Sequence, residues 1–155
     1  MPADFDEHYM EMALAEARNA DRAGEVPVGA IIVLDGLVVA RAFNQPISAS
    51  DPTAHAEMVA LREAARSVGN YRLSAAMMYC TLEPCMMCAG AMIHARIARL
   101  VFGALDPKAG SAGSIYNVLT DPRLNHRVEV VSGVRQAECS ALLRDFFSRR
   151  RKIFE

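Results

Sequence analysis

Hydrophobic residues recur at helical spacing near the start of the chain, at Met10, Ala13, Leu14 and Ala17. Residues three and four positions apart share one face of a helix, so this repeat predicts an amphipathic helix over residues 5–23. Gly24 follows as a stop signal.

Two apolar, β-rich runs come next, over residues 26–34 and 37–43, and Asp35-Gly36 lies between them. An Asp-Gly pair flanked by such runs is typical of a tight β-hairpin. The following segment, residues 44–52, is rich in Pro, Ser, Asn and Asp and is predicted to be a loop.

The rest of the chain alternates between helical and strand patterns. Helices are expected over 54–67, 84–95 and 136–152, and strands over 77–82, 100–103 and 127–131. The last helix is expected to turn Leu142, Leu143, Phe146 and Phe147 inward. This order predicts a single domain over residues 1–155, an α/β fold with three α/β/α layers around a central mixed five-stranded sheet.

Composition narrows the classes of protein that fit. With 155 residues, 52% hydrophobic content and a net charge of −1, the chain can build a real core but does not coat nucleic acid over its whole surface. It contains no apolar run of membrane-spanning length, and its acidic start does not resemble a signal peptide, so we expect a cytoplasmic protein without a membrane partner. In a reducing compartment the four cysteines are expected to be metal ligands or buried thiols.

Two short motifs carry candidate chemistry, His55-Ala56-Glu57 and Pro84-Cys85-Met86-Met87-Cys88, and each opens a predicted helix. Cysteines three apart lie on one helix face and can share a metal, and a helix start favours their thiolate form. We predict that His55, Cys85 and Cys88 bind one zinc ion, although a redox cysteine pair or two core thiols would also fit the Cys-x-x-Cys motif alone.

A three-ligand zinc site leaves one position for water, whereas a structural site normally has four protein ligands. No second Cys-x-x-Cys or His-x-x-x-His pair exists to complete the site. Glu57, two residues after His55, is placed to move protons to and from that water without being a ligand. These features favour catalytic zinc over a structural zinc site.

The motifs resemble the H-x-E…P-C-x-x-C signature of the cytidine-deaminase-like superfamily. Over nearly its whole length the chain is similar to bacterial tRNA-specific adenosine deaminases. The segments that carry the similarity are EVPVGAIIV (25–33), FNQPI (43–47), DPTAHAEMVAL (51–61), NYRL (70–73), YCTLEPCMMCAGAMIHARI (79–97), VFGA (101–104), NHRVEV (125–130) and DFFSRRR (145–151).

The resemblance implies a cytidine-deaminase-like fold, a homodimer with one zinc ion per subunit, and conversion of adenosine to inosine at the wobble position of a tRNA anticodon stem-loop. Zinc-activated water would attack C6 of adenine while Glu57 serves as the proton shuttle. A related enzyme acting on a small base or nucleoside, and a non-catalytic zinc module, are the alternatives.

The resemblance also implies substrate contacts. Val28, Asn44 and Ala56 would border the target nucleoside, Asp106 would meet the adjacent RNA, and Phe147, Arg149, Arg150 and Arg151 would contact the anticodon loop. From the residues alone, Asn44 and Asp106 could instead be turn residues, Phe147 could be core, and the arginines could be a solvated helix end. Leu105 and Ser148 depart from the family pattern, which has basic residues there.

Overall fold

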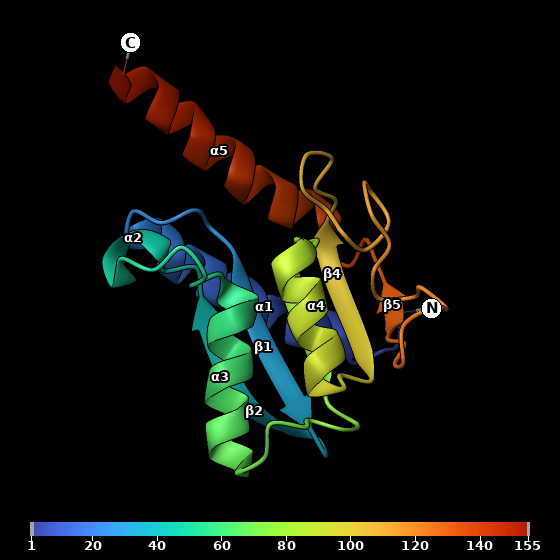
Figure 1. The fold of residues 1–155 in the computed structure, drawn as a ribbon. Helices are drawn as coiled ribbons and strands as arrows, with labels where there is room; N and C mark the ends of the chain where they lie inside the picture. The colour runs from blue at the N-terminus through green and yellow to red at the C-terminus, as the bar shows by residue number, and fades with distance from the viewer. Residues whose placement is uncertain (1, 155) are drawn as a thin grey trace.

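The computed structural model describes residues 2–154 as a sheet covered by helices on both faces (Figure 1). Along the chain the elements are α1 (Asp6–Arg22), β1 (Gly29–Leu34), β2 (Leu37–Phe43), α2 (Pro46–Ala49), α3 (Ala56–Val68), β3 (Met77–Leu82), α4 (Met86–Ala95), β4 (Arg99–Ala104), β5 (Glu129–Val131) and α5 (Gln136–Phe154). None of the helices within these residues is long and apolar enough to cross a membrane.

The sheet has five strands in the order β2-β1-β3-β4-β5. β1 pairs antiparallel with β2 and β3, whereas β3, β4 and β5 run parallel, so the predicted mixed sheet is confirmed. The hairpin turn also forms as expected. Asp35 and Gly36 both have positive φ, 52° and 76°, and two such residues give a turn whose twist matches that of the strands.

The three layers follow from the alternation of side chains in the strands. In β1, Ala30 and Ile32 pack in the core beneath α3 and α4, while Ile31 and Val33 pack in the core beneath α1 and α5. Figure 1 shows α3 and α4 side by side on the near face and α1 behind the sheet. The predicted α/β/α architecture is therefore confirmed.

The helix expected from residue 84 begins at Met86 and the strand expected from residue 127 begins at Glu129. Three other differences have a clearer physical reason or bear on the site. β1 begins at Gly29 rather than at residue 26, because Pro27 has no N–H to donate to a neighbouring strand. A one-turn helix, α2, lies inside the predicted loop 44–52. On α5, Phe146 is buried, but Phe147 is 45% exposed and does not face inward as expected, because consecutive residues point about 100° apart around a helix.

Candidate active site

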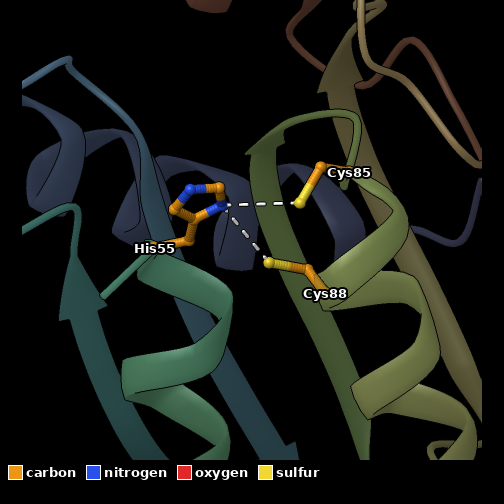
Figure 2. Close-up of side chains that lie close together, drawn as sticks. All are labelled: His55, Cys85 and Cys88. Atoms are coloured by element: carbon orange, nitrogen blue, oxygen red, sulfur yellow. Dashed lines mark hydrogen bonds between the residues drawn. The ribbon is translucent and has the colours of Figure 1, made fainter. Parts of the chain in front are cut away.

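Two helix starts bring the predicted metal ligands together. His55 is the residue before the first turn of α3, Cys85 holds the same position in α4, and Cys88 lies in the first turn of α4. Figure 2 shows both cysteine side chains pointing across the gap between the helices toward one imidazole. The ligand atoms of all three residues lie within 4.8 Å of one another.

The spacing of these atoms fits zinc. His55 Nδ1 lies 3.5 Å from Cys85 Sγ and 3.5 Å from Cys88 Sγ. Tetrahedral bonds of about 2.3 Å to sulfur and about 2.0 Å to nitrogen would separate nitrogen and sulfur by about 3.5 Å. The arrangement therefore matches a tetrahedral zinc site with three protein ligands.

The first turns of α3 and α4 have no side-chain capping hydrogen bond from the residue that precedes them. Ser, Thr, Asp or Asn usually bonds the free N–H groups there, but His55 and Cys85 make no side-chain capping hydrogen bond.

The two cysteine thiols have shifted pKa values. Hydrogen bonding with Cys88, supported by His55, outweighs burial and lowers the pKa of Cys85 to about 4. The pKa of Cys88 is raised by its bond to Cys85 and by burial. Because zinc binds thiolates, metal binding is expected to release a proton.

A cavity of about 230 Å³ opens beside the ligands, and six of the predicted site residues line it: Val28, Asn44, His55, Glu57, Cys85 and Asp106. Glu57 is only 4% exposed. Burial raises the pKa of its carboxyl, although His55 and a bond with Cys88 oppose this shift. A raised pKa makes the protonated form of the carboxyl easier to reach, as a group that must both accept and give up a proton requires.

Asn44 lines this cavity. Its N–H donates to the Val28 carbonyl over 3.0 Å, which joins two wall segments. Ala56 is fully buried in the first turn of α3, between the ligand His55 and Glu57. Val28 and Asn44 thus line the cavity beside the metal group, and Ala56 lies next to the ligand His55 in the first turn of α3.

Asp106 is both a cavity residue and a turn residue. Its Oδ1 accepts bonds from the N–H groups of Lys108 and Ala109, at 3.0 and 3.2 Å. The turn is held by Glu83, whose buried carboxylate accepts bonds from the N–H groups of Asp106, Ala112 and Ser114. Sequence reasoning missed Glu83, because backbone donors 23 to 31 residues away leave no side-chain pattern.

Beside the first cavity lies a larger one of about 440 Å³, bordered by exposed Leu105 and Phe147.

The three arginines predicted to contact RNA, on α5, differ in their contacts within the protein. Arg149 pairs with Asp21 at 2.6 Å, and Arg150 donates to the Gly24 carbonyl at 2.8 Å. Arg151 is exposed. Two of the three predicted RNA-binding arginines therefore also tie α5 to the end of α1.

Comparison with known proteins agrees with this geometry. The family model for the cytidine and deoxycytidylate deaminase zinc-binding region matches residues 3–104. These residues include the three ligands and Glu57, together with β1 to β4. The fold and the site together define a zinc-binding deaminase.

Individual relatives narrow the class. The chain is 48% identical to a tRNA-specific adenosine deaminase of Bacillus subtilis, over 95% of this chain and 91% of the relative. It is 50% identical to one of Haemophilus influenzae, over 97% and 87%. The chain belongs to the tRNA-specific adenosine deaminases within the zinc-binding cytidine and deoxycytidylate deaminase family.

Solved structures are similar as well. One comes from work on A-to-I editing by tRNA:A34 deaminases at the wobble position of tRNA, and it aligns with a TM-score of 0.85 and 46% identity, covering 88% of this chain and 99% of that one. A guanine deaminase from Nitrosomonas europaea aligns with a TM-score of 0.81 and 25% identity, over 96% and 86%. The scaffold is thus shared with an enzyme named for a different base.

Proposed function

We propose that this protein hydrolyses adenosine to inosine at the wobble position of a tRNA anticodon. The observation that carries the proposal is the three-ligand group in a cavity beside buried Glu57, in a chain close in sequence to tRNA-specific adenosine deaminases. The proposal includes a single catalytic domain over residues 1–155, a homodimer and a cytoplasmic location, where tRNA is used.

His55, Cys85 and Cys88 would hold the zinc ion. When bound, zinc lowers the pKa of a water molecule in its open coordination position and so supplies a nucleophile at neutral pH. Glu57 accepts the proton of the attacking water and delivers it to N1 of adenine. It then moves the proton of the new C6 hydroxyl to the amino group at C6, so that the C6–N bond breaks, ammonia leaves and the C6=O group of inosine forms. The raised pKa of Glu57 suits this double role.

The cavity wall would orient the base. Asn44 can hydrogen-bond the target nucleoside, and Val28 and the backbone of Ala56 border the base. A wobble nucleotide is single-stranded, so turning it out of the loop costs less than extracting a paired base.

The remaining RNA contacts would come from the second cavity and α5. Asp106 lines both cavities, so it lies where the nucleotide next to the target would pass. Exposed Phe147 offers a stacking surface, and Arg149, Arg150 and Arg151 offer positive charge to phosphates. Arg151 is exposed, whereas phosphate contacts by Arg149 and Arg150 would replace or extend their bonds to Asp21 and Gly24.

The decisive experiment compares three substrates with zinc-loaded protein: an anticodon stem-loop with A at the wobble position, the same loop with C there, and free adenosine. We expect deamination of the first substrate only, with inosine as the product. Equal turnover of free adenosine would instead favour a small-molecule deaminase, and no turnover of any substrate would refute the proposal. Light scattering of the same sample tests the homodimer.

A further inference from the structure

A carboxylate outside the metal group is buried at the edge of the cavity. Glu25, in the connection between α1 and β1, is 1% exposed. Its Oε1 accepts a bond from the Ile47 N–H at 3.1 Å, and its Oε2 accepts one from the Ser48 N–H at 2.7 Å. Ile47 and Ser48 belong to α2. Glu25 therefore bridges two segments that are adjacent in space but separate along the chain.

The segment that Glu25 holds is a closed loop. At its neck, the Gln45 N–H donates to the Ala54 carbonyl at 2.9 Å. Asn44 immediately precedes this neck and His55 immediately follows it, and both line the cavity. The loop thus begins beside a proposed substrate contact and ends beside a metal ligand.

The loop is also held near its end, where the Arg62 guanidinium on α3 donates to the Thr53 hydroxyl at 3.2 Å, but α2 itself is weakly packed. α2 has four residues, none of them buried, and a single helical turn is not stable by itself. On the other side of the contact, Glu25 is followed by Val26 and Val28, which line the same cavity. The contact therefore joins the loop to a segment that forms part of the cavity wall.

Glu25 is itself held in a charged state. Burial opposes ionisation, but the bonds from Ser48 and Ile47 and the nearby Arg150 outweigh it and lower the pKa of Glu25. Arg150 also donates to the carbonyl of Gly24. Helix α5 therefore supports the same connection from the other side.

We propose that Glu25 is a positioning residue, whose carboxylate clamps the 45–54 loop to the 24–28 segment and so sets the geometry of Asn44 and His55. This inference rests on the proposed function where Asn44 is concerned, but its effect on the zinc ligand His55 is independent of the substrate. The clamp acts through two backbone bonds, and Glu25 itself touches neither metal nor base.

Two variants and one control test the clamp. Glu25→Gln keeps the size of the side chain but turns an NH2 group toward one of the two N–H donors, and Glu25→Ala removes both acceptors. Glu63→Gln makes the same chemical change at an exposed site on α3. Each protein is measured for hydrogen exchange at the Ile47 and Ser48 amides, for zinc affinity by chelator competition, and for kcat and KM on the wobble-A stem-loop.

We expect Glu25→Gln to exchange the two amides about tenfold faster and to lose about tenfold in kcat/KM per zinc-loaded chain. Glu25→Ala should lose about a hundredfold and bind zinc several-fold more weakly, while Glu63→Gln should match the wild type. Measurements well below the melting temperature of each variant separate this loss from unfolding.

Unchanged amide exchange would overturn the clamp. Faster exchange with wild-type turnover and wild-type zinc affinity would overturn the positioning role and leave only a contribution to stability. If the wild type fails to deaminate the stem-loop, the proposed function fails, and zinc affinity in Glu25→Ala then decides the inference: weaker binding supports it, and unchanged binding overturns it.

Discussion

The carboxylate of Asp6, in the first turn of α1, accepts two hydrogen bonds from the guanidinium of Arg99 at the start of β4, each 2.8 Å long. The Tyr79 hydroxyl on β3 donates a third bond to Asp6 at 2.7 Å. Asp6 is fully buried. This contact joins the start of the chain to the middle of the sheet, on the face opposite the metal group.

Replacing Asp6 by Asn removes the buried counter-charge of the Arg99 guanidinium, whose ion pair with Glu129, at 3.4 Å, involves a carboxylate that is 61% exposed. We expect Asp6→Asn to lower the free energy of unfolding by about 3 kcal/mol. Denaturant unfolding of the wild type and the variant measures the difference. A loss of less than about 1 kcal/mol would show that the guanidinium of Arg99 finds adequate compensation elsewhere.

The same network predicts a pH dependence. Burial opposes ionisation of Asp6, but the bonds from Arg99, Ala3 and Tyr79 outweigh it, so the pKa of Asp6 is lowered on folding. A lowered pKa contributes stability above the unfolded value of about 3.9, and this stability is lost as the pH falls through the folded value. The stability gap between wild type and Asp6→Asn should therefore be full at pH 6 and shrink below about pH 4. A gap that stays constant down to pH 2 would contradict the assignment.

Glu57→Gln tests the proton shuttle. The amide keeps the shape of the side chain but cannot accept and return a proton, so we expect deamination to fall by at least about a thousandfold. Zinc content and melting temperature should stay close to those of the wild type, since Glu57 is not among the ligand atoms. Turnover within tenfold of the wild type would rule out the assigned role.

Zinc removal tests the metal group. We expect a strong chelator to abolish deamination and added zinc to restore it, because the three ligands supply the only metal-holding group found among residues 2–154. Cys88→Ser should reduce the bound zinc per chain and prevent this recovery, whereas Cys139→Ser, buried on the opposite face, should keep the metal. Metal analysis and inosine formation, measured on the same samples, check both expectations.

Gly29→Ala tests the packing of α1 on the sheet. A Cβ at Gly29 would lie 2.1 Å from the Ala13 carbonyl oxygen and 2.5 Å from the Ala17 nitrogen, both backbone atoms of α1. We expect a loss of about 3 kcal/mol in the free energy of unfolding, since the helix must move away. Gly90→Ala, with open space around the new Cβ, should be neutral or slightly stabilising. Equal effects of the two changes would contradict the close approach.

The sequence predicts most of this fold because its signals are local. The Asp35-Gly36 turn and the apolar periodicity of α1 each lie within a short window, and the observed hairpin and helix follow them closely. The metal ligands are predictable for the same reason, since each motif places its residues at a helix start.

The parts that the sequence does not predict depend on contacts between distant segments. Glu25 and Glu83 bind backbone N–H groups, which every residue except proline offers, so their partners carry no sequence signature. Arg149 resembles a free cation at a helix end, but its partner Asp21 lies 128 residues earlier. The folded structure is needed to show that Glu25, Glu83 and Arg149 bond other segments of the same chain.

The metal group lies at the starts of two helices, whereas the residues proposed to contact RNA lie in a turn and on an exposed helix face, and this difference affects how the sequence could evolve. The cysteine ligands lie at the start of α4 and Glu57 lies in the first turn of α3, whereas Asp106 lies in a turn and Phe147 on an exposed face of α5. Substitutions in the turn and on α5 can therefore accumulate without displacing a ligand. A lineage could exchange one substrate for another through surface changes of this kind while its hydrolytic chemistry is inherited intact.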